Sequence, residues 1–105
     1  MVRGEVFRLH RMREARGGEQ RGARYAVVLQ ADELLPLSTV IVAPTSASAP
    51  PRSFRPVIDV NGQSTRVLIE QMSAVSVDRL GASAGRLAAV ELRAVDEALV
   101  LVLGL

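Results

Sequence analysis

The sequence lacks cysteine, tryptophan and lysine, and it contains only two phenylalanines and one tyrosine in 105 residues. Without cysteine there can be no disulfide, no zinc–thiolate site and no thiol nucleophile, and a reducing cytoplasm is the compartment we expect. Because the only histidine is His10, we expect neither a metal site nor another cofactor. Aromatic residues make up 3% of the chain and hydrophobic residues 49%, so the core must consist of aliphatic side chains.

Long apolar runs are also missing. No window of about 18 consecutive apolar residues occurs, so we expect no membrane span. The first residues, MVRGEVFRLHRMR, contain no apolar segment of the kind found in signal peptides. A length of 105 residues suits one domain, residues 1–105, and is too short for two. These features predict a single-domain cytoplasmic protein without a membrane partner.

Every one of the 13 basic residues is an arginine. A coding bias toward GC-rich codons explains the absence of lysine, but it does not explain where the arginines lie. Residues 1–24 contain seven arginines and three glutamates, whereas the remaining residues contain six arginines and eight acidic residues. Since a planar guanidinium can hold two phosphate oxygens at once, this distribution predicts a basic surface for phosphate groups.

Short apolar segments predict a chain made mostly of strands. Residues 26–29 form a run with no polar break, which is typical of a strand buried on both faces. The dipeptide Asn61-Gly62 separates two apolar segments and predicts a tight hairpin. We expect strands at residues 2–9, 24–30, 39–43, 55–60, 65–70 and 71–77. Single helical turns are expected at residues 31–35 and 77–80, and loops at residues 10–23 and 44–53.

One helix is expected, at residues 89–103, because apolar residues recur there at helical spacing and Gly104 follows. Ala88 offers no capping oxygen at its start, and Arg93 and Glu97 are spaced as an i,i+4 pair. Apolar residues occupy two sides of this helix: Val95, Leu99 and Val102 on one, and Ala94, Ala98, Leu101 and Leu105 around the other. A single small sheet cannot cover both sides, so we expect a homodimer.

Together these elements predict an α+β protein, with a barrel-like antiparallel sheet and a terminal helix. Five segments carry a more specific signal: RGEVF (3–7), GGEQRGAR (17–24), VIVAPTS (40–46), LIEQMSAVSVDRLGASAGRL (68–87) and VDEALVLVLGL (95–105). In this order they resemble the MazF/PemK family of toxins from type II toxin–antitoxin systems. No single segment is specific, but together they cover nearly the whole chain.

The resemblance implies a fold, an activity and two partners. The fold would be a small SH3-like β-barrel of about five to seven mostly antiparallel strands with a C-terminal helix. The activity would be metal-independent cleavage of single-stranded RNA at short sequences, leaving a 2′,3′-cyclic phosphate and a 5′-hydroxyl. Family members are typically homodimers, and a cognate antitoxin inhibits them by laying an acidic C-terminal segment over the RNA groove. Two other classes stay open: toxins of the same fold that bind DNA gyrase without chemistry, and plain nucleic-acid-binding modules.

The resemblance also implies which residues form the active site and contact the RNA. Arg24 matches the family's catalytic arginine and would stabilise the charge that develops on the phosphate. Thr45 matches the catalytic threonine, whose hydroxyl can donate to a phosphate oxygen. Glu19 would act either as general base or as the group that orients Arg24. The implied RNA contacts are Arg16, Gln20, Arg21, Ser46 and Gln71.

Simpler interpretations of the same residues remain. Arg24 at the start of a strand could pair with a surface acid, and Thr45 after a proline could cap a loop. His10 has a side chain suited to acid–base chemistry, but a lone histidine after a strand is more often a bystander. The chain also departs from the family pattern, with Tyr25 where a proline is usual, Phe7 where a tryptophan is common and His10 in place of an aspartate. These departures leave the matched residues Glu19, Arg24 and Thr45 in place, and they bear on which RNA sequence the protein would prefer.

Overall fold

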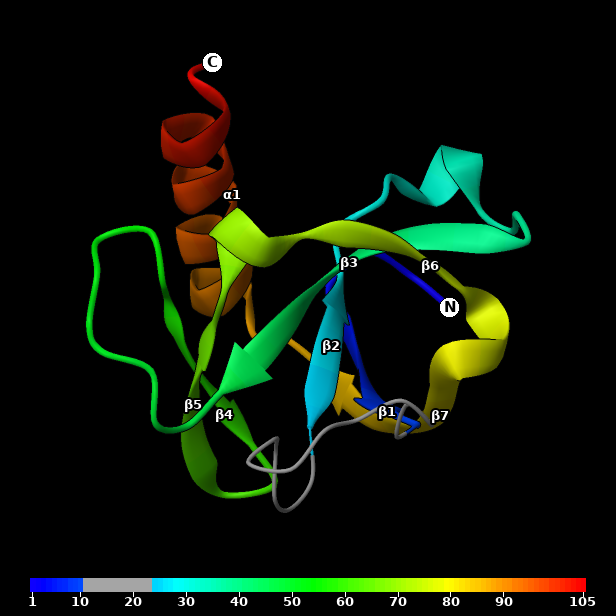
Figure 1. Ribbon diagram of the computed structural model, residues 1–105, viewed down its shortest axis with the longest axis horizontal. Coiled ribbons are helices and arrows are strands. Elements are labelled where there is room, and N and C mark those ends of the chain that lie inside the picture. The colour runs from blue at the N-terminus through cyan, green and yellow to red at the C-terminus, as the bar shows by residue number, and fades with distance from the viewer. Residues whose placement is uncertain (11–23) are drawn as a thin grey trace, which may run out of the picture.

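The computed structural model describes residues 1–10 and 24–105, which form one curled sheet and one long helix (Figure 1). The strands are β1 (Glu5–Leu9), β2 (Tyr25–Val28), β3 (Thr39–Ser46), β4 (Val57–Val60), β5 (Gln63–Val67), β6 (Ser73–Ser76) and β7 (Leu80–Arg86). Helix α1 spans Ala89–Leu103, and short 3₁₀ turns lie at η1 (Asp32–Leu34), η2 (Ile69–Gln71) and η3 (Val77–Arg79). This half-barrel with a C-terminal helix confirms the predicted α+β fold. The predicted loop at residues 10–23 lies, apart from His10, outside the described residues.

Strand β3 is the centre of the sheet. All pairings between the described strands are antiparallel, and the path runs β4-β5-β3-β2-β1-β7, with β6 also paired to β3. Along one edge β3 pairs with β6 over residues 39–42 and then with β5 at Thr45 and Ser46. Because β3 changes partner in this way, the sheet curls and the end of β3 faces the β4–β5 hairpin (Figure 1).

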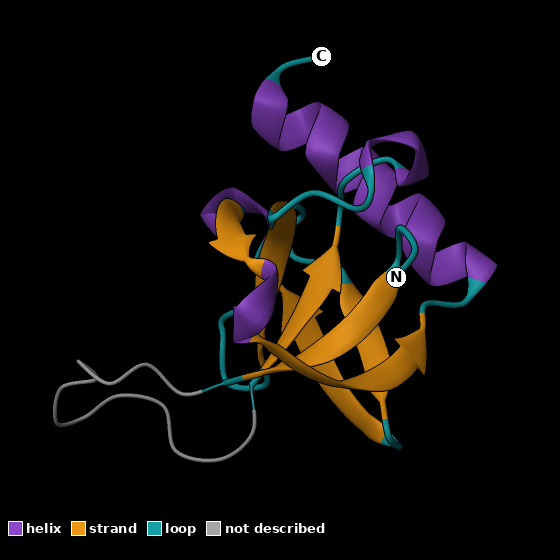
Figure 2. Ribbon diagram, turned by 90° about the vertical axis from the view of Figure 1, so that its right-hand side faces the viewer, coloured by secondary structure: helices purple, strands orange, loops and turns teal. Residues whose placement is uncertain are grey.

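Side chains are buried on both faces of the sheet. One cluster packs under α1 and consists of Val6, Val27, Leu29, Ala43, Ile58, Val60, Val67, Ile69, Val95 and Ala98. A second cluster on the opposite face is centred on Ala26, Val28, Val40 and Val42. Figure 2 shows α1 lying along one side of the curled sheet. Strand β2 supplies both clusters, which confirms the prediction that residues 26–29 are buried on both faces.

Several predicted boundaries of the strands were wrong. Residues 44–46, expected in a loop, belong to β3, because β5 takes over as partner at this point and the Leu68 N–H donates to the Pro44 carbonyl at 2.8 Å. A proline lacks the N–H for a ladder bond, so it is tolerated where the ladder changes partner. The first strand begins at Glu5 rather than residue 2, and β5 ends at Val67, where η2 follows.

Strand β7 was not predicted at all. Its sequence, LGASAGR, consists mostly of small residues with low strand propensity. It pairs with β1 through a register that shifts at two points, and Gly85 adopts a φ of +106°, which side chains rarely tolerate. The pairing therefore depends on β1 and not on a local apolar pattern.

The hairpin and the helix agree with their predictions. Asn61 and Gly62 have φ values of +53° and +82°, as a two-residue hairpin turn requires. Helix α1 has the predicted bounds, and Gly104 ends it in the left-handed conformation with φ +69°. However, Ala98, expected on the outer side, is buried at 3% exposure, and Arg93 and Glu97 form no ion pair within the described structure.

The start of α1 is fixed by Glu91. Its carboxylate accepts hydrogen bonds from the Ala88 N–H and the Asp59 N–H, both at 2.8 Å. Ala88 has no side-chain acceptor to return a bond, so only one half of a capping box forms. Glu91 thus joins the helix to β4. Within residues 1–10 and 24–105, no helix has both the length and the apolar character needed to cross a membrane.

We expect Glu91→Ala to lower the free energy of unfolding by about 1–2 kcal/mol, because two backbone N–H groups lose a charged acceptor. Glu97→Ala, at an exposed position of the same helix, is the matched control and should change stability by less than about 0.5 kcal/mol. Urea unfolding monitored by circular dichroism measures both. Equal effects of the two substitutions would show that Glu91 does not anchor the helix.

Candidate functional site

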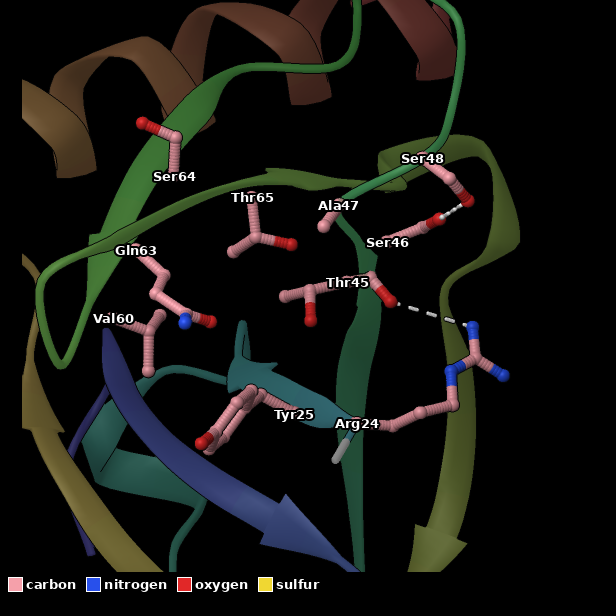
Figure 3. Close-up of a pocket in the computed structure, with 10 residues that line it drawn as sticks. All are labelled: Arg24, Tyr25, Thr45, Ser46, Ala47, Ser48, Val60, Gln63, Ser64 and Thr65. Atoms are coloured by element: carbon pink, nitrogen blue, oxygen red, sulfur yellow. Dashed lines mark hydrogen bonds between the residues drawn. The ribbon is translucent and has the colours of Figure 1, made fainter. Parts of the chain in front are cut away.

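A cavity of about 270 Å³ opens at the end of β3 (Figure 3). Three parts of the chain contribute: the start of β2, the end of β3 with the loop after it, and the β4–β5 hairpin. The residues that line it are Arg24, Tyr25, Thr45, Ser46, Ala47, Ser48, Val60, Gln63, Ser64 and Thr65. One guanidinium, one amide and several hydroxyls therefore face a common space.

The pleat of the strands divides these residues into two groups. Ala26 pairs with Pro44, and continuing this register by one residue places Tyr25 opposite Thr45. Arg24 and Ser46, one residue further, lie on the other face. In Figure 3 the Thr45 side chain points toward the hairpin, whereas the Arg24 guanidinium lies on the Ser46 side of the β3 backbone.

Arg24 is only partly satisfied by its surroundings. Its Nη2 donates to the Thr45 carbonyl at 3.4 Å, a long hydrogen bond, and its buried Nε has no hydrogen-bond partner among the described residues. Burial lowers the pKa of Arg24 from its usual value, because desolvation disfavours the charged form. An arginine nevertheless stays protonated at neutral pH. The site therefore holds a cation with donors available for an anionic ligand.

Thr45 is buried at 3% exposure, and Ser46 is half-buried beside it. The structure thus brings together three of the predicted site residues, Arg24, Thr45 and Ser46. Gln71 lies exposed in η2 and does not line the cavity. The other predicted residues, Arg16, Glu19, Gln20 and Arg21, lie outside the described residues.

Sequence reasoning missed Tyr25, Gln63 and Thr65 in this cavity. Tyr25 was noted only as a departure from the family pattern. Gln63 follows the Asn61-Gly62 turn directly, and a hairpin that folds toward β3 would have placed its side chain here. The Asn61-Gly62 turn could therefore be predicted from the sequence, but the curl of the sheet, which brings Gln63 to the cavity, could not.

His10 lies apart from this cavity. Its backbone N–H donates to the Arg79 carbonyl at 2.9 Å, and a Cβ placed on Gly81 would lie 3.4 Å from its ring. The histidine therefore packs against the start of β7 and is not among the cavity residues. Within the described ranges, no three His, Cys, Asp or Glu side chains are grouped as a metal site would need.

Arg55 holds the loop that forms one rim of the cavity. Its guanidinium donates twice to Glu70 Oε2, at 2.7 and 3.1 Å, and once to the Pro50 carbonyl at 3.1 Å. It also lies 5.7 Å from the centre of the Phe54 ring. The hydrogen bonds from Arg55 hold the pKa of Glu70 below its usual value. This clamp ties the loop between β3 and β4 to the segment after β5.

A cation beside several hydroxyls, at the open end of a small barrel, is suited to binding a polar anionic ligand. The profile of a family described as PemK-like, MazF-like toxin of type II toxin–antitoxin system matches residues 2–103. A Mycobacterium tuberculosis protein of strain H37Rv, provisionally named a toxin, is 44% identical over 77 residues, or 73% of this chain and 72% of that protein. The chain belongs to the PemK/MazF family of type II toxin–antitoxin toxins.

Solved structures with the same fold agree with this assignment. An endoribonuclease in complex with its cognate antitoxin, from a mycobacterial species, matches with a TM-score of 0.80 at 17% identity, covering 100% of this chain and 96% of its own. M. tuberculosis toxin MazF-mt6 matches with a TM-score of 0.76 at 20% identity, covering 96% and 97%. A MazE-MazF structure from Deinococcus radiodurans has a TM-score of 0.76 at 22% identity, covering 100% and 96%. At these identities the likeness shows the shared fold.

The Arg55–Glu70 pair leads to a pH-dependent prediction. A carboxylate whose folded pKa is depressed contributes stability above its unfolded pKa, about 4.3, and loses it as pH falls through the lower folded value. Glu70→Gln should therefore be less stable than wild type at pH 7, by less than about 1 kcal/mol for so exposed a pair, and equally stable near pH 2. Thermal unfolding across this range measures the difference.

Glu97→Gln, which removes an exposed acid from α1, is the control and should show no comparable difference at pH 7. A Glu70→Gln difference that stays constant from pH 7 to the acid limit would contradict the role of the ion pair.

Proposed function

We propose that this toxin is an endoribonuclease that cuts single-stranded RNA without a metal ion and leaves 2′,3′-cyclic phosphate and 5′-hydroxyl ends. The observation that supports this most is the placement of Arg24 and Thr45 at one cavity in a chain of the PemK/MazF family. Two of the similar structures are described as endoribonucleases or as MazF toxins, which agrees with the proposal. A reducing cytoplasm, where RNA is present, is the compartment in which it would act.

The chemistry divides into three tasks. The 2′-hydroxyl of the substrate must lose its proton, the phosphate must carry additional negative charge, and the leaving 5′-oxygen must gain a proton. Arg24 would stabilise the additional charge, because its guanidinium is permanently protonated and its Nε has no partner among the described residues. The Thr45 hydroxyl would donate to a second phosphate oxygen. Glu19 would serve as general base or would orient Arg24.

Arg24 and Thr45 need a small rearrangement to share one phosphate. The guanidinium lies on the Ser46 side of β3, and the Thr45 side chain points to the other side (Figure 3). Among the described residues, the guanidinium donates one hydrogen bond there, of 3.4 Å to the Thr45 carbonyl. Since a bond of this length is weak, turning Arg24 toward a bound phosphate loses little and gains a charge-assisted pair. Gln20, Arg21, Arg16 and Ser46 would hold the neighbouring nucleotides.

The other partner would be an antitoxin. Structures of related toxins include complexes with a cognate antitoxin, and we propose that an acidic segment of such a partner covers this cavity. Carboxylates would meet the same guanidinium that a phosphate would, so antitoxin and RNA would exclude each other. Binding of both should weaken with salt.

Purified protein should cut single-stranded RNA in the presence of EDTA. Arg24→Ala and Thr45→Ala should each lower kcat by about 10²–10³, with binding much less affected, because both donors act on charge that develops in the transition state. Thr45→Ser keeps the hydroxyl and should retain most of the rate. Single-turnover cleavage of a labelled RNA measures these values.

Arg93→Ala, an exposed arginine on α1, is the matched control for the loss of one positive charge. If Arg24→Ala and Thr45→Ala both cut at the rate of the wild type, the active site lies elsewhere. If the wild type binds RNA without cutting it, the protein is a binding module and the proposal of an enzyme fails.

We propose further that the toxin is a homodimer. The C-terminal part of α1 and the residues after it leave Leu101, Leu103 and Leu105 exposed at 57%, 53% and 83%, and neighbouring exposed apolar side chains of this kind can form a subunit contact. Light scattering at micromolar concentration should give twice the chain mass of 11.3 kDa. Leu101→Asp should yield the monomer if this helix face is the contact, whereas Glu97→Gln should not. A wild type of monomeric mass would rule out the dimer.

A further inference from the structure

The cavity has a charged half and a neutral half. Arg24 and Ser46 lie on one face of the strands, and the residues on the other face carry no charge. We call this second group the neutral half; it consists of Tyr25, Thr45, Val60, Gln63 and Thr65. A phosphate or a carboxylate would find no cation among these five side chains. The neutral half is therefore suited to a flat, uncharged group with hydrogen-bonding edges.

Tyr25 supplies a flat surface at this place. The protein has only three aromatic residues, and Tyr25 is the one that lines the cavity. Phe7 packs against the second hydrophobic cluster, and Phe54 packs against the first beside Arg55. Tyr25 also contacts the first cluster, but it is only half-buried and it lines the cavity. An aromatic ring held in this way is a surface on which a base can stack.

Gln63 supplies the hydrogen-bonding group. It is the first residue of β5, and the Asn61-Gly62 turn fixes its position by pairing it with Val60. In Figure 3 its amide points into the space between Tyr25 and Thr45. An amide offers a donor and an acceptor side by side, which is the pattern that reads the edge of a nucleobase. Thr65, at 9% exposure, adds a hydroxyl on the same face.

We propose that the neutral half is a nucleobase subsite, in which Tyr25 stacks on one base of the RNA and Gln63 reads its edge. This rests on the proposed function, because the base would belong to a nucleotide whose phosphate lies at Arg24. The alternation of β3 accounts for the arrangement, because Thr45 lies between the two groups: the phosphate would lie between Arg24 and Thr45, and the base beyond Thr45, at Tyr25 and Gln63. Among the described residues that line this half none offers a cation, so the carboxylates of an acidic antitoxin segment would be directed to Arg24 instead. Gln63 is thus a residue that determines which RNA sequence is cut.

The test compares cut sites on one long RNA for the wild type and for Gln63→Ala. Gln63 is exposed, so its loss should leave the fold intact, as thermal unfolding will verify. The variant should lose preference at one position of the cut sequence, by about 5- to 100-fold between the favoured base and the others, while other positions keep theirs. Asp59→Ala, an exposed residue on the same hairpin outside the cavity, should leave the preference unchanged.

Tyr25 is tested by binding. An RNA oligonucleotide lacking the base at the affected position should bind the wild type about 5- to 100-fold more weakly than the intact RNA. Tyr25→Phe should retain this difference, whereas Tyr25→Leu should bind both RNAs with the same low affinity.

The failures are distinguishable. A wild type that does not cut RNA overturns the proposed function. A wild type that cuts, together with a Gln63→Ala variant of unchanged preference at every position, overturns the base subsite alone. If Gln63→Ala instead weakens binding of the antitoxin and leaves binding of RNA unchanged, the neutral half is a contact for the protein partner. That result would also overturn the subsite.

Discussion

The change of partner along β3 is the constraint on which the rest of the structure depends. From Thr39 to Val42 the strand is paired with β6, and at Thr45 and Ser46 it is paired with β5. Pro44, which has no N–H to offer, lies between the two ladders, and its carbonyl accepts the bond that starts the second one. The hairpin of β4 and β5 is therefore brought over the end of β3, and the cavity forms between them. A straight β3 with one partner would leave Thr45 on an open sheet edge.

The aliphatic core makes this geometry possible. Val and Ile pack well on a pleated sheet, and β2 and β3 supply them to both faces, so the strands are held from two sides without large aromatic side chains. The three aromatic residues pack at the borders of these clusters, and Tyr25 also lines the cavity. Arg55 clamps the loop beside the cavity to Glu70, and Glu91 clamps the helix to β4. In each clamp a charged side chain binds a group on another element: Arg55 binds the carboxylate of Glu70, and Glu91 binds the N–H of Asp59. These contacts hold the segments that form the rim of the cavity.

Local patterns in the sequence were sufficient to predict those secondary-structure elements that depend on local interactions. The apolar run at residues 26–29, the Asn61-Gly62 turn and the bounds of α1 were all predictable, because periodicity and turn chemistry specify them. Strand β7 was not, since LGASAGR has neither alternation nor strand propensity and forms only because β1 offers an edge. The chemistry of Arg24, Thr45 and Ser46 was suggested by resemblance, and their proximity in the fold agrees with it. Gln63 could not be placed in advance, because its position depends on the curl of the sheet.

Arg24 shows how the fold and the proposed chemistry are linked. A buried donor without a partner costs about 1–3 kcal/mol, and the described part of the chain offers the Arg24 Nε none. Among the described residues this donor is left open at a strand end, where Arg24 is half-buried. An anionic ligand would satisfy the guanidinium and recover the cost, so binding free energy and stability are coupled at this residue. The neutral residues on the opposite face of β3 bear no such cost, because their amide and hydroxyl groups face the open cavity. The same strand end can therefore hold an anion by charge and distinguish its attached base by shape and hydrogen bonding.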